Sequence, residues 1–239
     1  MDNQPDSKSA GDRRHILASG FTSLDDALAA SLAPDNLPLN KNTGRAWTVF
    51  DLGLSSLIKR ASDLGLSPDQ VAQVQAAAEK QLQKGLRLCE SPIECMVLAA
   101  LITAPWPKSL LTIPPIVHDA RGNGDQELQP GDLVIVPQAT LFRYRLDFCV
   151  IIEASAYQRL AVAIECDGAE FHADHAKEVK RDAYLHSLGV RVHHLTGSEI
   201  HRDAMNSIRP VLDATARFVG GAPSMTKQSA LALSPSRAA

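Results

Sequence analysis

The sequence predicts an α/β protein in which helices flank a mixed β-sheet. Two apolar, β-branched runs, residues 143–153 and 160–166, lie on either side of a short polar segment and have the composition of paired strands. A third apolar run, residues 190–195, follows after a helical pattern. The resulting order of helix, strands, helix, strand and helix is typical of a mixed α/β layer.

The first 90 residues indicate a helical appendage over 15–90, preceded by a disordered N-terminus over 1–14. Apolar residues recur at spacings of three and four within 21–32 and again within 47–64. The tetrapeptide Ser67-Pro68-Asp69-Gln70 then has the pattern of a helix start, with a serine N-cap, proline at N1 and glutamine at N3. We expect a helix to run from this point toward residue 88.

The main domain is expected to cover residues 91–219 and to be followed by a disordered tail over 220–239. It opens on a second helix start, Ser91-Pro92-Ile93-Glu94, and Pro105 stops the helix that follows. The periodicity and the flanking residues predict four further elements: a strand over 132–137, a helix over 177–188 ended by Gly189, a strand over 190–195 and a helix over 203–218 that starts late because of Pro210.

Composition narrows the class of protein. The chain has 239 residues, of which 45% are hydrophobic, and its 24 Lys and Arg nearly balance its 27 Asp and Glu. This balance argues against a globally basic nucleic-acid binder but is compatible with a local basic groove. The longest apolar run, residues 95–106, is shorter than the roughly 20 residues of a membrane span, and the polar N-terminus does not resemble a secretory signal. We therefore expect a cytoplasmic protein with no membrane partner.

Two kinds of cofactor site are not indicated by the sequence. The four cysteines show no C-x-x-C spacing, so they suggest neither a zinc knuckle nor a redox pair. The glycine-containing segment 121–125 lacks the spacing and the lysine of a phosphate-binding loop, and we expect no nucleotide cofactor.

Three carboxylates interrupt or end the two apolar runs. Asp147 lies inside the first run, and Glu165 and Asp167 end the second. A charged side chain in a buried strand is costly unless it is paired or binds a cation. If the two runs form a hairpin about Tyr157, Asp147 lies opposite Glu165 or one step from it, at a Cβ separation of about 4.5–5.5 Å.

Two interpretations of these carboxylates are open. A divalent cation between them would turn their repulsion into a binding site, and hard oxygen ligands suit Mg²⁺ or Mn²⁺. Alternatively, each carboxylate is solvated at a strand end or is paired with a nearby cation, for which Arg143, Arg145 and Lys180 are the candidates.

An ordered series of motifs adds to this pattern. The series is Ser91-Pro92-Ile93-Glu94 with Leu98; Pro137-Gln138 followed by Tyr144-Arg145-Leu146-Asp147-Phe148; Ile164-Glu165-Cys166-Asp167-Gly168 with Phe171-His172; Arg181-Asp182 with Leu185 and Gly189; and Thr196-Gly197-Ser198-Glu199-Ile200 with Arg202-Asp203. It resembles the Vsr-like branch of the PD-(D/E)XK nuclease superfamily, which includes the very-short-patch-repair endonucleases. The resemblance covers residues 91 to about 204.

The resemblance implies a restriction-endonuclease-like fold and a metal-dependent endonuclease that hydrolyses phosphodiester bonds in DNA. It implies Asp147 and Glu165 as ligands of Mg²⁺ (or Mn²⁺), and it implies a catalytic set of Glu94, Asp147, Glu165, Asp167 and His172. Asp167 stands where the superfamily name has a lysine, as is usual in this branch, and Lys177 or Lys180 is then the candidate for the lysine's role. The candidate DNA-contacting residues are Arg145, Lys177, Lys180 and Arg181.

Several of these residues also have a structural interpretation. Ser-x-x-Glu is itself a capping box, so Glu94 serves either the helix start or the metal site. His172 is a candidate for contacting phosphate or moving a proton, and equally for a structural histidine. At the last strand, where relatives often have an arginine, this chain has His193-His194. The alternative function on the same fold is a catalytically degenerate DNA-binding or regulatory module.

Overall fold

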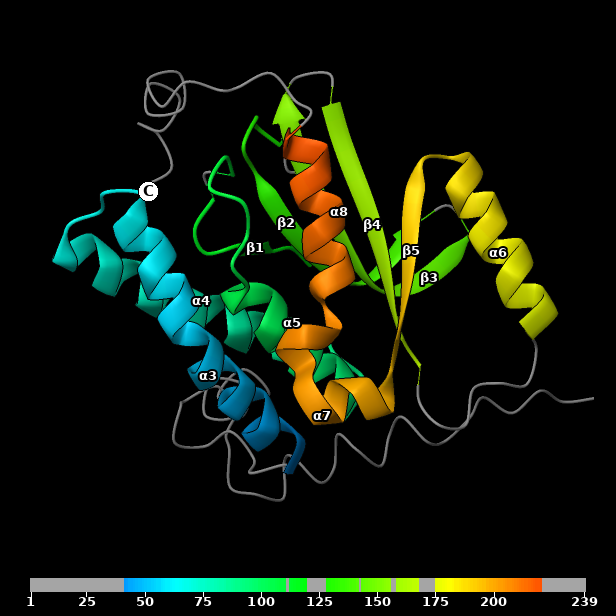
Figure 1. Ribbon diagram of the computed structural model, residues 1–239. Helices are drawn as coiled ribbons and strands as arrows, with labels where there is room; N and C mark the ends of the chain where they lie inside the picture. Colours follow the sequence, from blue (N-terminus) through cyan, green and yellow to red (C-terminus); the bar gives the residue numbers. More distant parts are fainter. Residues whose placement is uncertain are drawn as a thin grey trace, which may run out of the picture. The chain divides into compact units, whose positions relative to one another are not determined.

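The computed structural model describes residues 41–110, 112–119, 128–141, 143–155, 158–167 and 175–220 (Figure 1). Its helices are α3 (Lys41–Asp63), α4 (Pro68–Leu86), α5 (Pro92–Thr103), α6 (His175–Ser187), α7 (Gly197–Ser207) and α8 (Arg209–Gly220). Its strands are β1 (Ile116–Val117), β2 (Leu133–Leu141), β3 (Tyr144–Ser155), β4 (Gln158–Asp167) and β5 (Val190–Thr196). The expected disordered ends, 1–14 and 220–239, and the helical pattern over 21–32 lie outside the described residues, except that Gly220 is the last residue of α8.

The strands form one five-stranded sheet in the order β1-β2-β3-β4-β5. The two outer pairs, β1 with β2 and β4 with β5, are parallel, whereas β3 runs antiparallel to both of its neighbours, β2 and β4. Helix α6 connects the parallel strands β4 and β5, as a crossover between parallel neighbours requires. The predicted α/β class, with helices flanking a mixed sheet, is confirmed.

The register of the sheet lines up four polar residues. In the β3–β4 hairpin the ladder ends at Phe148 opposite Ile164, and Asp147 and Glu165 are the next residues on the two strands, close to the position that the sequence predicted. On the other side of β3, the flanking pairs of β2 place Gln138 beside Asp147. Glu165 in turn pairs with His194 of β5. A polar row therefore crosses the sheet near one end.

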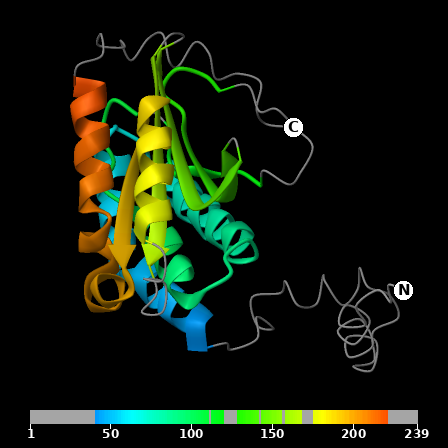
Figure 2. The ribbon, with the colours of Figure 1, turned by 90° about the vertical axis from the view of Figure 1, so that its right-hand side faces the viewer.

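The two faces of the sheet pack against different helices. Phe148, Val150 and Ile164 belong to the main core, which also contains residues of α3, α4, α5, α7 and α8. Cys149 and Ala163 point to the other face and pack in a smaller cluster with residues that include Leu185 of α6. Accordingly, α8 and α6 lie on either side of β5 in both views (Figures 1 and 2). This alternation follows from the two-residue period of a strand.

Helix α5 is buried on all sides. Its residues from Glu94 to Thr103 are all buried, which fits a helix that is apolar around most of its circumference. Two glycines on neighbouring helices let it pack closely: a Cβ at Gly53 would lie 2.0 Å from Thr103 Oγ1, and one at Gly85 would lie 2.5 Å from Leu98 Cδ2. No helix among the described residues has both the length and the apolar character needed to cross a membrane.

The helices before residue 90 share this core. Phe50 and Leu57 of α3 and Leu82 of α4 belong to the same buried cluster as α5 and the sheet. The described residues from Asn42 onward also form one compact unit. This differs from the expected boundary near residue 90. Residues 42–90 form part of the main core, because their apolar faces cover α5 and not one another alone.

The helix ends follow local rules, with one correction. Ser67 and Gln70 form the predicted capping box at the start of α4, and Gly189 adopts a φ of +81° after α6. The last helical region, however, starts at Gly197 and not at residue 203. Thr196 caps it with Glu199 in a second capping box, and a kink at Asp203 precedes the separate helix α8. The pattern Thr-x-x-Glu was visible in the sequence as a capping signal.

Candidate functional site

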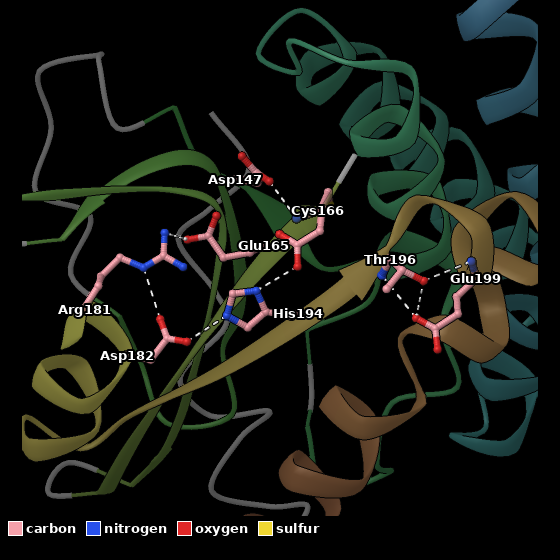
Figure 3. A network of polar contacts seen from close by, with 9 residues as sticks. Asp147, Glu165, Cys166, Arg181, Asp182, His194, Thr196 and Glu199 are labelled. Atoms are coloured by element: carbon pink, nitrogen blue, oxygen red, sulfur yellow. Dashed lines mark hydrogen bonds and ion pairs between the residues drawn. The ribbon is translucent and has the colours of Figure 1, made fainter. Parts of the chain in front are cut away.

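Asp147 and Glu165 are brought together on adjacent strands at the polar row. Asp147 Oδ2 accepts a hydrogen bond from the backbone N–H of Cys166 at 2.7 Å (Figure 3). The Glu165 side chain is 11% exposed, and its Oε1 atom lies 3.3 Å from Arg181 Nη1. That oxygen is buried and has no hydrogen-bond partner among the described residues. The site therefore contains a buried carboxylate oxygen whose hydrogen bonding is unsatisfied.

Burial raises the pKa of both carboxyl groups. It raises the pKa of Asp147 to about 6, against the Cys166 N–H bond that lowers it, and Glu94 and Asp167 add to the rise. Burial likewise raises the pKa of Glu165 to about 7, although Arg181 lowers it. Near neutral pH the pair therefore holds protons more readily than exposed carboxylates do. A cation that favours the ionised forms would displace those protons.

Glu94 takes part in the start of α5 and also contacts Gln138 of the polar row. Ser91 Oγ accepts a hydrogen bond from the backbone N–H of Glu94 at 3.3 Å, which is half of a capping box. The Glu94 carboxylate, however, accepts from the backbone N–H of Glu90 at 2.8 Å and from Gln138 Nε2 at 2.7 Å. Glu94 thus closes the turn before α5 and also faces the polar row from the helical side.

Gln138 links Glu94 to Arg145. Its φ of +52° is unusual for a residue other than glycine. Its Oε1 atom accepts a hydrogen bond from Arg145 Nε at 2.6 Å. Arg145 also forms an ion pair with Glu90. One of the candidate DNA-contacting cations is therefore already engaged within the protein.

A second chain of contacts joins β4, β5 and α6. His194 lies between two carboxylates, with Nδ1 at 2.9 Å from Asp167 Oδ2 and Nε2 at 2.8 Å from Asp182 Oδ2 (Figure 3). Asp182 Oδ1 accepts from Arg181 Nε at 3.1 Å. Burial lowers the pKa of His194, but the hydrogen bonds to Asp182 and Asp167 outweigh it, so that the pKa is raised overall. The chain of contacts connects Asp167 to Glu165 through α6.

An aromatic cluster holds α6 against the β2–β3 hairpin. The Tyr144 and Tyr184 rings meet edge to face at 5.8 Å between centroids. The Arg143 guanidinium lies 5.1 Å and 5.5 Å from these two centroids and donates a hydrogen bond to Tyr144 Oη at 2.8 Å. The cluster fixes the helix that carries Arg181 and Asp182 relative to the strand that carries Asp147.

The structure brings together most of the residues that the sequence singled out. Glu94, Asp147, Glu165 and Asp167 lie around the polar row, with Arg145 and Arg181 beside them. Lys177 and Lys180 are exposed on α6, and His172 lies outside the described residues.

Sequence reasoning missed the partnership of His194 with Asp182. It had noted the two histidines of the strand and an Arg181–Asp182 pair, but no local pattern shows that α6 places Asp182 against His194.

The donor set suits a hard cation only in part. Both carboxylates offer oxygen atoms, the ligand type that Mg²⁺ and Mn²⁺ prefer. Within the described ranges, however, no three His, Cys, Asp or Glu side chains converge as a ready ligand group. Two carboxylates with the remaining positions filled by water match the habit of Mg²⁺, which usually retains several waters. The unsatisfied Oε1 atom of Glu165 is the feature that fits such an ion.

Comparisons with protein-family models, with curated proteins and with solved structures found no match. What is known of the class is therefore what the fold itself defines, an α/β protein built on a five-stranded mixed sheet with helices on its faces.

Proposed function

We propose that this protein is a divalent-metal-dependent endonuclease that hydrolyses phosphodiester bonds in DNA, with a restriction-endonuclease-like fold. The observation that carries the proposal is that Asp147 and Glu165 are the residues directly beyond the last pair of the β3–β4 ladder, Phe148 and Ile164, at one end of the sheet. Burial raises the pKa of both groups, and one buried oxygen of Glu165 lacks a hydrogen-bond partner among the described residues. Buried carboxyl groups with raised pKa values, brought together from separate strands, are typical of functional sites.

In this proposal Asp147 and Glu165 hold the metal, Mg²⁺ or Mn²⁺. When bound, the ion supplies a Lewis acid that offsets the charge developing on the phosphate. Cys166 keeps the Asp147 carboxylate in place through its backbone N–H. Glu94 adds negative charge to the site, and Gln138 orients it. Asp167 is held by His194, which limits its motion beside the reacting group.

DNA is the proposed partner, and the number of cationic side chains that contact its phosphates determines how strongly the affinity depends on salt. The candidates for phosphate contacts are the exposed Lys177 and Lys180 together with Arg145 and Arg181. About four contacts would give a slope of log K against log salt near −3 to −4 for duplex DNA. A binding titration at several salt concentrations measures this slope. Affinity that is flat with salt would contradict a phosphate-contacting role for these cations.

The direct test is incubation of purified protein with plasmid DNA in Mg²⁺ or in EDTA. We expect the wild-type protein to cleave the plasmid in Mg²⁺ but not in EDTA. The cleavage rate should fall by roughly a hundredfold or more in Asp147→Asn and in Glu165→Gln. Glu153→Gln is the matched control, because Glu153 is a buried carboxylate at the other end of the same hairpin, paired with Arg159 at 2.7 Å. Cleavage that survives in Asp147→Asn or Glu165→Gln would refute the site.

A second candidate function is a DNA-binding or regulatory module that keeps the fold without turnover. Two observations favour it. Arg181 already compensates Glu165, and the described residues offer no three-residue ligand group. Salt-dependent DNA binding without cleavage in Mg²⁺ or Mn²⁺ would support this candidate over the nuclease.

A further inference from the structure

Arg181 is the cation that lies against the proposed metal ligand Glu165. Its Nη1 atom is 3.3 Å from Glu165 Oε1, and its side chain is 20% exposed. The contact does not satisfy that oxygen with a hydrogen bond. Arg181 therefore compensates the charge of Glu165 without a directed bond, and a different cation could replace it at this oxygen.

A separate contact keeps Arg181 in the site. Its Nε atom donates to Asp182 Oδ1 at 3.1 Å, so this attachment does not use either of the two Nη groups. Asp182 is itself held, because its other oxygen is bound to His194 Nε2 at 2.8 Å. His194 in turn is fixed by Asp167. If the guanidinium leaves Glu165, it thus stays tethered at the edge of the site.

We propose that Arg181 is an exchangeable counter-ion, which neutralises Glu165 when the metal is absent and turns its Nη groups to a DNA phosphate when a divalent cation takes its place. The inference rests on the proposed function, because it needs a metal at Asp147 and Glu165 and a phosphate nearby. A planar guanidinium suits both partners, since it binds carboxylate and phosphate with the same fork of N–H donors.

The exchange couples two binding events. The metal competes with Arg181 for Glu165, so the wild-type protein binds metal more weakly than a protein without that arginine. The released guanidinium then adds a phosphate contact that the metal-free protein lacks. Metal and DNA therefore strengthen each other's binding, as linkage requires of any such coupling. A merely structural Arg181 would instead support the site, and its loss would weaken metal binding.

The first experiment measures metal affinity by calorimetric titration with Mn²⁺ and with Mg²⁺, without DNA. We expect Arg181→Gln to bind about two- to fivefold more tightly than wild type, the range for loss of a competing, partly exposed ion pair. The matched control is Lys80→Gln, which removes the same charge from an exposed position on α4 and leaves the metal affinity unchanged. Equal or weaker binding by a folded Arg181→Gln protein overturns the inference.

A second variant covers the possibility that Arg181→Gln does not fold. Arg181→Met removes the charge but keeps a long, unbranched side chain, so the competition for Glu165 is lost and metal affinity rises. Unchanged or weaker affinity in a folded Arg181→Met protein overturns the inference. If wild type binds neither Mn²⁺ nor Mg²⁺, the proposed function fails together with it. If wild type binds metal and the variants bind no tighter, only the counter-ion role fails.

The second experiment measures binding of a DNA duplex by anisotropy, in Ca²⁺ and in EDTA. We expect Ca²⁺ to strengthen binding by wild type and to steepen its salt dependence. In Arg181→Gln the slope of log K against log salt in Ca²⁺ should fall by about 0.9, the contribution of one phosphate contact, with little change in EDTA. A slope that falls equally in both conditions overturns the exchange, because Arg181 would then contact DNA whether or not metal is bound.

Discussion

The β3–β4 hairpin buries a glutamate at each end, and the protein treats the two differently. Glu153 is buried beside Arg159, whose Nε donates to its carboxylate at 2.7 Å. Glu165 is buried beside Arg181 at 3.3 Å, with an oxygen that lacks a hydrogen-bond partner among the described residues. The same sheet thus contains one carboxylate that is satisfied and one that is not. The difference separates a hydrogen-bonded ion pair from a carboxylate with an unsatisfied oxygen, which is where we propose that a second cation binds.

The largest expected effect is on the pH dependence of stability. Burial raises the folded-state pKa of Asp147 to about 6 and that of Glu165 to about 7, above the ordinary values of 3.8 and 4.5. Their contribution to stability is therefore present at low pH and is lost as the pH rises through the folded pKa values. In EDTA, wild type should lose on the order of 3 kcal/mol between pH 4 and pH 8 relative to Asp147→Asn/Glu165→Gln. Denaturant unfolding at each pH measures this difference.

The control for this prediction is Glu153→Gln, which leaves Asp147 and Glu165 intact. Its stability in EDTA should still fall between pH 4 and pH 8, because it retains both of these carboxylates. A parallel dependence in wild type and in the Asp147→Asn/Glu165→Gln protein would show that the two carboxylates titrate normally.

The two glutamates should respond in opposite directions to neutralisation. Glu153→Gln removes a charge-assisted hydrogen bond from a buried position, and we expect it to destabilise the protein by about 2 kcal/mol at pH 7. Glu165→Gln removes a charge from beside Asp147, so the stability of the metal-free protein should hold or increase. Thermal and urea unfolding in EDTA compare the two variants. A larger loss of stability in Glu165→Gln than in Glu153→Gln would contradict the proposed difference between the two glutamates.

Divalent metal should stabilise the folded protein by binding at Asp147 and Glu165, and Glu153 should have no part in this effect. Because a ligand that binds the folded state alone stabilises it by mass action, Mg²⁺ at ten times its dissociation constant adds about 1.4 kcal/mol. We expect Mg²⁺ to raise the melting temperature of wild type and of Glu153→Gln. The rise should vanish in Asp147→Ala/Glu165→Ala. A melting temperature that responds to Mg²⁺ in that double variant would place the metal elsewhere.

The smallest expected effect concerns His194. Although burial lowers its pKa, the hydrogen bonds to Asp182 and Asp167 raise it overall. The stabilisation is therefore fully present below the ordinary histidine pKa and is lost as the pH rises through the folded value. His194→Gln should cost about 1 kcal/mol or less at pH 5.5, and the difference from wild type should shrink above neutral pH. Unfolding at pH 5.5 and 8.5 tests this, and a difference that grows with pH would contradict it.

Local patterns in the sequence predicted much of the fold. The β3–β4 hairpin register follows from the lengths of two apolar runs and the turn between them, so the juxtaposition of Asp147 and Glu165 was accessible before the structure. The capping box of α4 is equally local, because Ser67 and Gln70 satisfy each other within one turn. The start of α7 could have been found from the same kind of signal at Thr196 and Glu199.

The long-range contacts of the site could not be predicted in this way. Arg181 meets Glu165, and Asp182 meets His194, only because α6 crosses the sheet at one angle and rotation, and no short motif encodes either quantity. The sharing of one core by α3, α4 and α5 is also a tertiary property. The sequence showed that these helices are amphipathic but not which surface they cover.

The side-chain amide of Gln138 limits which residues can replace it at this position. Its amide presents a donor to Glu94 and an acceptor to Arg145, so a single neutral group serves as an adapter between an acidic helix end and a basic strand residue. A glutamate at this position would satisfy the arginine alone, and a lysine would satisfy the carboxylate alone. Substitutions that preserve both hydrogen bonds are therefore confined to side chains that carry both a donor and an acceptor.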